Sequence, residues 1–562
     1  MTSLLRSTLL LTAVITLHGC EPTIIPHSNV TAASPCTGKL GVRCPFFCDV
    51  GFLAAGIHVC QSYTTASGVV VLDNVFFGGR CDPLCAKDVP CATGLVPTRR
   101  NTTTADGSWC LATTCATADD TLRRLARGAY GTWRLARDDV TGIYTGEVDL
   151  TPSAVQSTRG HIGINGVALM FECVAAEMGW ITRADAAARV TRSLSALAGE
   201  LQGFSLERQV AAGWLTTFFN ISTGANVYEK QPYTVLDTGL NSAGVLFARS
   251  YFLGTAVRDT DASARNATKE LARLAKKVFN LVRFENGILC NSAGEVDAEG
   301  TNIPFTLDNA GGCSALHAPL ADGFYDFSEL HYSVWLSFSR VCVGATTGGC
   351  KDKPIENMWN AWQSRRLHPN LAYHGFPLLS DWPSYIVHLP FYSSHSFNTD
   401  ANWSSLFESH WAADKTYFST AAYYAGDNGR YGLAAGPTDE WCSAKDSTYE
   451  ADMLAGDNYT AGAQGCRLFS PYAIAGYLPA SPTEITADLL ALISAGDTVV
   501  DINSFVEGDF VLLRKSLFDL AWNQTNFITL VDFSSELFGL STLWLSTDFW
   551  RNWTNHNFTD LQ

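Results

Sequence analysis

The chain has little positive charge. Its 562 residues include 38 Lys and Arg against 54 Asp and Glu, for a formal net charge of −16. A surface with this balance repels polyanions, so the composition argues against a nucleic-acid partner and fits a neutral ligand. Charged residues make up only 16% of the chain and hydrophobic residues 47%. The chain can therefore bury a large core in one large domain, with a small domain beside it.

Several motifs of catalysis and cofactor binding are also missing. The chain contains no H-E-x-x-H zinc motif, no G-x-x-x-x-G-K-[ST] phosphate loop, no G-x-G-x-x-G after a strand and no G-x-S-x-G elbow. We therefore expect neither a metal nor an organic cofactor.

Apolar runs long enough for a confident membrane span are missing too. The polar C-terminus NWTNHNFTDLQ argues against a lipid-anchor signal. Residues 1–20 are typical of a secretory signal peptide: Arg6 gives the positive start, 9–17 the apolar stretch, and small residues follow. The ending LHGC also resembles a bacterial lipoprotein cleavage site, but the glycosylation signals argue against that interpretation.

Nine Asn-x-Ser/Thr signals without an intervening Pro follow the signal peptide, and they favour a eukaryotic secreted glycoprotein. They lie at Asn29, Asn101, Asn220, Asn266, Asn402, Asn458, Asn523, Asn552 and Asn557.

Seventeen cysteines are present, and in an oxidising compartment they predict disulfides rather than zinc ligands. Cys20 lies at the expected cleavage site, and nine others crowd into residues 36–115. Cys173 lies in an apolar helical pattern and is either free or paired with Cys115. Plausible local pairs are Cys290 with Cys313, Cys342 with Cys350, and Cys442 with Cys466.

The pattern divides the mature chain in two. Residues 21–115 are rich in Cys, Gly and short strand-like runs, which predicts a small module held by disulfides. From 116 to 562 the pattern is helical, without the strand-helix alternation of a parallel sheet. The predicted helices span residues 121–135, 165–178, 182–201, 238–252, 263–282, 328–341, 354–366 and 483–494. Helical hairpins closed into a ring and an irregular helical array both fit this pattern.

One carboxylate lies in an unusual setting. Glu329 interrupts the aromatic, mostly uncharged run GFYDFSELHYSVWLSFSR of residues 323–340. A Glu in such a run is either paired or kept as a neutral acid, and a raised pKa suits a general acid. The alternative is a Glu on the wet face of an amphipathic helix.

Ordered segments across about 430 residues resemble the glycoamylase-like family, which includes the endo-β-1,2-glucanases. The resemblance begins with GHIGIN at 160–165 and MGWITR at 178–183. It continues through VLDTGL at 235–240, DFSE at 326–329, FYSSHS at 391–396, YGLAA at 431–435, LFD at 517–519 and VD at 531–532. The segments at 431–440, 516–522 and 531–539 depart from the family pattern.

This resemblance implies an (α/α)6 toroid, here preceded by the small disulfide-rich module, and an inverting endo-hydrolase of β-1,2-glucan. It implies Glu329 as general acid and Asp519 as base, with Asp532 as the alternative base. Asp237 would support the substrate or the acid, unless it is only a helix N-cap. His395 would contact a sugar hydroxyl, unless its role is structural. Asp439 or Glu440 would replace a family Asp that has no clean match.

Aromatic residues between 380 and 442 lie in segments that look like loops, and they fit a sugar channel because indole and phenol rings stack on pyranose faces. They are Trp382, Tyr392, Trp403, Trp411 and Trp441. Packing of loops onto the helices is the alternative role, and we expect about two of the five to touch sugar.

Two other functions stay open. The helical part could be an inactive, carbohydrate-binding or protein-interaction surface glycoprotein. Alternatively, the cysteine-rich module could carry the function, with the helices as its scaffold.

Overall fold

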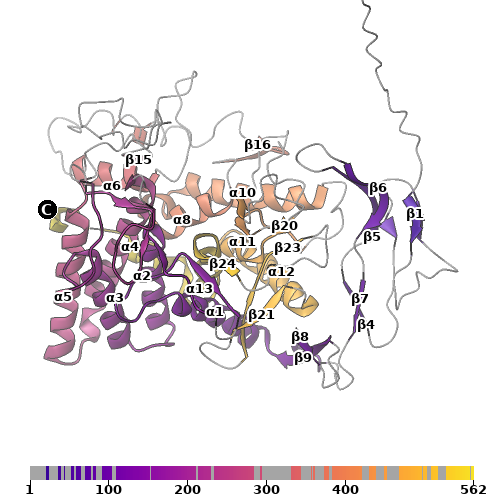
Figure 1. The fold of residues 1–562 in the computed structure, drawn as a ribbon, viewed down its shortest axis with the longest axis horizontal. Helices are drawn as coiled ribbons and strands as arrows, with labels where there is room; N and C mark the ends of the chain where they lie inside the picture. Colours follow the sequence, from indigo (N-terminus) through magenta and orange to yellow (C-terminus); the bar gives the residue numbers. More distant parts are fainter. Residues whose placement is uncertain are drawn as a thin grey trace, which may run out of the picture.

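The structure is a computed structural model of the chain (Figure 1). It describes strand segments between residues 20 and 83 and most of the chain from residue 91 on. The described ranges from there are 91–103, 109–151, 154–209, 213–228, 233–283, 292–293, 331–342, 356, 359–360, 372–378, 383–420, 429–437, 449–451, 468–496, 498–502, 508–516, 524, 527–556 and 558–561.

Every described element before residue 117 is a strand, and Figure 1 shows β1 and β4–β7 grouped beside the helices. Cys91 and Cys115 form a disulfide that closes the β8–β9 hairpin. The strands are β1 (Cys20–Thr23), β2 (Cys36–Gly38), β3 (Arg43–Cys44), β4 (Phe52–Ala55), β5 (His58–Thr64), β6 (Val70–Phe77), β7 (Arg80–Pro83), β8 (Val96–Thr103) and β9 (Trp109–Ala116). The division of the mature chain into two domains at residue 115 stays a prediction.

The remainder is mainly helical. Its helices are α1 (Ala118–Leu135), α2 (Ile162–Glu177), α3 (Arg183–Leu197), α4 (Val235–Gly254), α5 (Ala262–Asn280), α6 (His331–Val341), α8 (Tyr385–Ser393), α9 (His395–Asn398), α10 (Ala401–Thr420), α11 (Pro471–Gly476), α12 (Pro482–Ala495) and α13 (Leu530–Thr554), with 3-10 turns at Ala256–Arg258 and Phe558–Leu561.

Short strands cross the helical part. They are β10 (Glu147–Asp149), β11 (Arg159–His161), β12 (Leu215–Thr216), β13 (Phe218–Asn220), β14 (Tyr233–Thr234), β15 (Ser292–Ala293), β16 (Ala372–Tyr373), β17 (Phe376–Pro377), β18 (Ala435–Pro437), β19 (Tyr449–Ala451), β20 (Leu468–Phe469), β21 (Val499–Ile502), β22 (Asp509–Leu512), β23 (Lys515–Ser516) and β24 (Phe527–Thr529). All strand pairs of the described residues are antiparallel, as expected without strand-helix alternation.

The helices differ in how much of their surface is buried. In α2 every residue from Ile162 to Ala175 is buried, which makes it a core helix. In α5 burial is limited to one stripe, which includes Leu271, Leu274 and Val278, so that helix covers the core from outside. The central helix α13 packs against α1, α2, α4, α8 and α11.

Two glycines let α2 and α4 touch along their backbones. A Cβ built on Gly244 would lie 2.0 Å from the carbonyl oxygen of Gly166, and one on Gly166 would lie 2.5 Å from the Cα of Asn241. No side chain fits at either position without moving a helix. This contact sets the distance between the two helices and therefore between their first turns.

The predicted helices of the described residues are confirmed, with shifted ends. The helix predicted at 182–201 is α3, where the Thr182 hydroxyl accepts a hydrogen bond from the Asp185 amide at 3.0 Å. It ends four residues early, before Gly199, which has a positive φ of 69°. Most of the predicted helix at 354–366 lies outside the described residues.

The prediction of loops between 380 and 442 is wrong for part of that range. Tyr392 lies in α8, and Trp403 and Trp411 lie in α10. The sequence concealed α8 because Pro390 lies inside it, and an interior proline normally disfavours a helix.

Of the two expectations for Cys173, free or paired with Cys115, the structure confirms the first. It is a buried free thiol, and Cys115 is bonded to Cys91 instead. Cys342 is disulfide-bonded. The other cysteines of the predicted local pairs lie outside the described residues.

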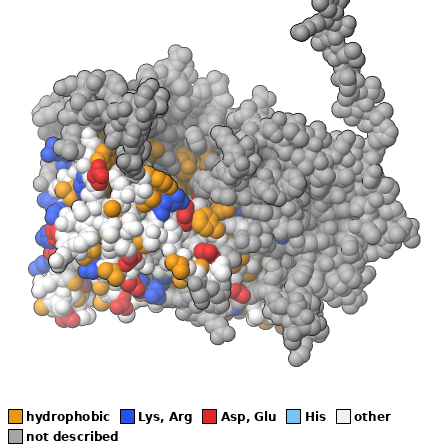
Figure 2. Space-filling view, viewed as in Figure 1, with side chains coloured by type: hydrophobic (Ala, Val, Ile, Leu, Met, Phe, Trp, Pro, Cys, Tyr) orange, Lys and Arg blue, Asp and Glu red, His pale blue; other side chains and the backbone are white. Residues whose placement is uncertain are grey.

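The described surface carries both signs of charge. Figure 2 shows Lys and Arg interspersed with Asp and Glu over the visible described face, without a continuous basic patch. Among the described helices, none has both the length and the apolar character that crossing a bilayer demands.

Replacement of Gly244 by Ala tests the contact between α2 and α4. The added methyl would overlap the Gly166 carbonyl, so we expect a loss of about 1–3 kcal/mol in the free energy of unfolding, measured by urea denaturation. Ser263→Ala, at an exposed position of α5, is the control and should change stability by less than about 0.5 kcal/mol. A Gly244→Ala protein as stable as the wild type would contradict the contact.

Candidate active site

Two adjacent cavities form a groove where the core helices begin. The first, the Asp237 pocket, has a volume of about 210 Å³ and is lined by His161, Leu236, Asp237, Leu240, Tyr332, Tyr385, Leu389 and Val531. The second, the Phe527 pocket, has about 370 Å³ and is lined by Gly146, Glu147, Arg159, His161, Ile164, Phe218, Phe527, Thr529, Val531 and Asp532. His161 and Val531 line both. The groove therefore collects side chains from the first turns of α2, α4, α6, α8 and α13.

Asp237 lies in the first turn of α4, facing the start of α2. Thr234 is the N-cap of α4, so the alternative that Asp237 caps the helix is wrong. The Asp237 Oδ1 atom lies 3.6 Å from Nε2 of His161, the N-cap residue of α2. A Cβ on Gly163 would lie 2.9 Å from the same oxygen. A carboxylate at this point is stabilised by the positive ends of two helix dipoles.

Asp532 occupies the equivalent position in α13, three residues after the N-cap Thr529. The Thr529 hydroxyl donates a hydrogen bond to Asp532 Oδ2 at 2.9 Å. The residue is only 1% exposed, while the Asp237 side chain is 22% exposed. The groove thus contains a reachable carboxylate and a nearly enclosed one.

Polar groups beneath the groove are held without charge. Glu536, one turn after Asp532, is fully buried, and burial raises the pKa of its carboxyl well above the usual value. The Leu512 amide donates to its Oε1 at 3.3 Å, and Oε2 has no hydrogen-bond partner among the described residues. His388 of α8 contacts the Ser535 hydroxyl through Nδ1 at 2.9 Å, and burial lowers its pKa. These two buried groups therefore add no charge to the floor of the groove.

Of the predicted site residues that the structure describes, Asp237 and Asp532 line the groove. Tyr392 and Trp403 are core residues: the Tyr392 hydroxyl donates to the Gly476 carbonyl at 2.8 Å, and Trp403 packs on Phe397. Their alternative role of packing fits this placement. His395 starts α9, with Nδ1 3.1 Å from the Arg551 carbonyl oxygen, and lines neither pocket. Glu329, Asp519, Trp382, Trp441 and Asp439 lie outside the described residues.

Sequence reasoning missed several residues of the groove. His161 stands inside the GHIGIN segment and Tyr332 follows Glu329 by three residues, so a signal in the sequence lies beside each of them. Phe218 and Phe527 had no such signal, because each lies in a strand of three residues.

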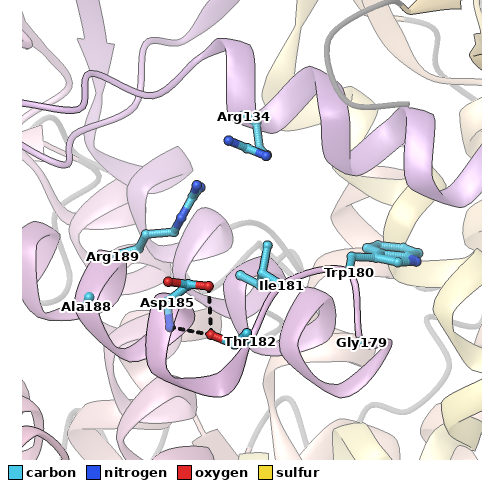
Figure 3. Close-up of a pocket in the computed structure, with 8 residues that line it drawn as sticks. All are labelled: Arg134, Gly179, Trp180, Ile181, Thr182, Asp185, Ala188 and Arg189. Carbon is cyan, nitrogen blue, oxygen red and sulfur yellow. Dashed lines mark hydrogen bonds between the residues drawn. The ribbon is translucent and has the colours of Figure 1, made fainter. Parts of the chain in front are cut away.

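A larger cavity of about 610 Å³ lies at the opposite end of α2 (Figure 3). Arg134 and Arg189 point into it from α1 and α3, above Ile181. Its carboxylate, Asp185, accepts a hydrogen bond from the Thr182 hydroxyl at 2.7 Å, as part of the cap of α3.

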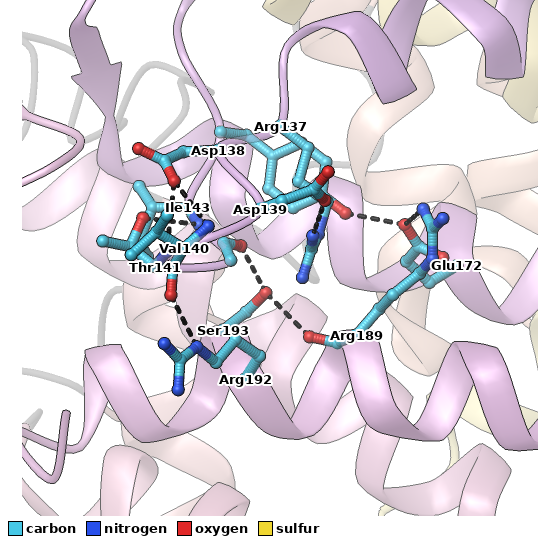
Figure 4. A network of polar contacts seen from close by, with 12 residues as sticks. Arg137, Asp138, Asp139, Val140, Thr141, Ile143, Glu172, Arg189, Arg192 and Ser193 are labelled. Atoms are coloured by element: carbon cyan, nitrogen blue, oxygen red, sulfur yellow. Dashed lines mark hydrogen bonds and ion pairs between the residues drawn. The ribbon is translucent and has the colours of Figure 1, made fainter.

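Arg189 forms an ion pair with a buried carboxylate of the core (Figure 4). Its Nη1 lies 3.5 Å from the buried carboxylate of Glu172, which accepts hydrogen bonds from Tyr144 at 2.7 Å and Tyr130 at 3.0 Å. Burial and the Glu172 carboxylate raise the pKa of both hydroxyls, which therefore stay protonated as donors. This network gives Arg189 a structural role, so the groove is the stronger candidate for a functional site.

Among the described residues, no group of three or more His, Cys, Asp or Glu side chains is arranged to hold a metal ion.

The fold has solved counterparts. A candidate glucoamylase from Bacteroides uniformis superposes with a TM-score of 0.55 at 14% identity, over 79% of this chain and 96% of its own. The endo-β-1,2-glucanase of Chitinophaga pinensis, in complex with sophorotriose and glucose, gives 0.53 at 13% identity, over 79% and 97%. That of Talaromyces funiculosus, in complex with sophorose, gives 0.50 at 12% identity, over 77% and 87%.

The chain has the fold of these glucoamylase-like and β-1,2-glucanase structures. No protein-family model and no curated protein sequence matches it. The structural likeness confirms, at the level of the fold, the resemblance drawn from the ordered sequence segments.

The buried acid beneath the groove makes a prediction about pH. Because the folded-state pKa of Glu536 is raised, its contribution to stability is present below about pH 4.3, the unfolded value, and is lost as the pH rises toward the folded value. Glu536→Gln removes this titration. Above pH 5, the free energy of unfolding of the variant should rise relative to that of the wild type by about 1.4 kcal/mol per pH unit, measured by urea unfolding at several pH values.

Glu408→Gln, at an exposed position of α10, is the control and should follow the wild type at every pH. A constant difference in stability between Glu536→Gln and the wild type from pH 4 to 8 would show that Glu536 ionises normally in the folded protein.

Proposed function

We propose that the chain is a glycoside hydrolase that cleaves β-glucan internally, with β-1,2-linked glucan as its substrate. The observation that carries this proposal is the groove, in which Asp237 and Asp532, each in the first turn of a core helix, line two adjoining pockets. The fold supports it, because solved structures with this fold include enzymes named endo-β-1,2-glucanases, in complex with sophorose or sophorotriose.

We infer that the core helices close into an (α/α)6 toroid. Core helices such as α2 and α4 contact one another and also contact the outer helices α3 and α5. This alternation of core and covering helices is what a ring of helical hairpins requires, and their first turns then share one end of the ring.

In this proposal Glu329 is the general acid and Asp519 the base. Glu329 precedes Tyr332 by three residues, so their Cα atoms lie within about 11 Å of each other. Tyr332 lines the Asp237 pocket, and this closeness in sequence supports a role for Glu329 at the groove. Glu329 would protonate the leaving glycosidic oxygen, while Asp519 would take the proton of the attacking water, directly or through a sugar hydroxyl.

Asp532 is the alternative base. It lines the Phe527 pocket, but its near-complete burial and its hydrogen bond from Thr529 favour a positioning role. Asp237, which is more exposed, would hold a sugar hydroxyl beside the acid. The base and the acid must lie far enough apart to admit a water molecule if the configuration at the anomeric carbon is inverted.

A panel of β-1,2-, β-1,3- and β-1,4-glucans tests the substrate. We expect new reducing ends only from β-1,2-glucan, with inversion seen by NMR of the first products. Glu329→Gln and Asp519→Asn should each lower kcat by about 10²- to 10⁴-fold, because each removes a proton-transfer group. Asp532→Asn should retain more activity than Asp519→Asn.

Glu408→Gln serves as the matched control, since it is an exposed Glu on α10. Activity of Asp519→Asn near the wild-type level, with Asp532→Asn inactive, would transfer the role of base to Asp532. Glucan binding without hydrolysis by the wild type would support the alternative of an inactive carbohydrate-binding glycoprotein.

We further propose that the protein is secreted and glycosylated. Asn266, Asn402 and Asn552 are exposed on α5, α10 and α13, so glycans fit there without disturbing the core. Expression in eukaryotic cells should release the protein into the medium. Enzymatic removal of N-glycans should then lower its mass, and peptide mapping should find these three sites modified. Retention of an unglycosylated protein inside the cells would contradict the proposal.

A further inference from the structure

The Phe527 pocket lies between two short strand pairs. On one side β24 pairs with β10, with Phe527 opposite Asp149 and Thr529 opposite Glu147. On the other side β11 pairs with β13, with His161 opposite Phe218. The wall is therefore made of backbone that is hydrogen-bonded in both halves. Side chains on such strands are held in place before a ligand arrives, which limits the entropy lost on binding.

An ion pair joins the two halves. Arg159 of β11 contacts the Glu147 carboxylate of β10 through Nη2, and its Nη1 donates to the Tyr228 hydroxyl at 3.0 Å. The Arg159 side chain is 34% exposed and that of Glu147 19%. A guanidinium carries five N–H donors and a carboxylate about four acceptor positions, so the pair keeps capacity for further hydrogen bonds. Because the two charges of the pair cancel, the pair is better fitted to bind the hydroxyl groups of a neutral ligand than an anion.

The two phenyl rings of the pocket have different surroundings. The Arg159 guanidinium lies over the Phe218 ring at 5.0 Å from its centroid, and His161 and Tyr228 pack against the same ring in edge-on orientations. Phe218 is thus a support for the arginine. Phe527 is 43% exposed, and no ring contact to it is found among the described aromatic residues. An exposed phenyl ring at the rim of a cavity offers an apolar face to a ligand.

We propose that the Phe527 pocket binds one pyranose ring of a neutral glucan chain. The ring stacks on Phe527, and its hydroxyl groups bond to Arg159 and Glu147. The volume of about 370 Å³ lies at the low end of ligand sites, which suits a single sugar unit. His161 and Val531 also line the Asp237 pocket, so the next sugar along the chain enters that pocket. The inference rests on the proposed glucan hydrolase and names the residues that bind the chain beside the cleavage point.

The inference adds an aromatic sugar contact from a strand to those that the sequence predicts between 380 and 442. Of that region, Tyr385 lines the Asp237 pocket, and Trp382 and Trp441 lie outside the described residues. A purely structural role is the competing explanation: Phe527 would cover the core, and the ion pair would only tie β10 to β11. The two explanations differ in whether Phe527 affects long substrates more than short ones.

The test compares Phe527→Ala with the wild type on β-1,2-linked gluco-oligosaccharides of increasing length. We expect kcat/KM of the wild type to rise at the length that first reaches the pocket. In Phe527→Ala this rise should shrink by about 3- to 10-fold, as expected for the loss of one stacked ring. The change should appear in KM, with kcat within about twofold, and Phe527→Tyr should restore it.

Leu253→Ala is the matched control. Leu253 is a large apolar residue of similar exposure, 39%, at the far end of α4, about 24 Å along the helix from Asp237. It should leave the length dependence unchanged, and thermal unfolding should show both alanine variants to be folded.

Equal effects of Phe527→Ala on all lengths, or none, would overturn the inference and leave the proposed hydrolase standing. If the wild type binds the oligosaccharides without cleaving them, their affinities measured by calorimetry replace kcat/KM, and the same length dependence is expected. If the wild type neither cleaves nor binds any of them, the proposed function fails and this inference fails with it.

Discussion

The backbone contact between α2 and α4 is the constraint on which the groove depends. Gly166 and Gly244 remove the side chains that would hold the helices apart, and the carbonyl of one glycine occupies the space of the missing methyl of the other. The two helices then begin side by side. Because of this, the N-cap residue His161 of one helix lies 3.6 Å from the Asp237 carboxylate in the first turn of the other.

The acidic and neutral polar groups around this contact lie at different depths. Carboxylates lie in the first helical turns, where the helix dipoles and the cap of Thr529 stabilise negative charge. One turn deeper, Glu536 and His388 are buried and kept neutral by desolvation. The short strands β10, β11, β13 and β24 add a second wall, on which apolar rings and a neutralised ion pair lie together.

Several features could be read from the residues alone. The helix at 182–201 was recognisable because Thr182 caps it and apolar residues follow at helical spacing. Asp237 and Asp532 were found because each lies within a segment with a family resemblance. The helices α8 and α10 were missed for physical reasons: Pro390 lies inside the first, and the buried residues of α10 include the polar His410 and Asp414, which interrupt its apolar pattern. In such helices tertiary packing overrides the local signal.

The sequence by itself determined the helical character of the chain, the acidic balance of its surface and the identity of two groove carboxylates. These follow from composition, from periodicity and from short ordered segments. Only the tertiary structure decided which side chains meet. Tyr392 and Trp403 became core, and Phe527, Phe218, Arg159 and Glu147 became the wall of a cavity. The reason is that pairing between strands and contact between helices join residues hundreds of positions apart, such as Glu147 and Phe527, and no local pattern encodes that distance.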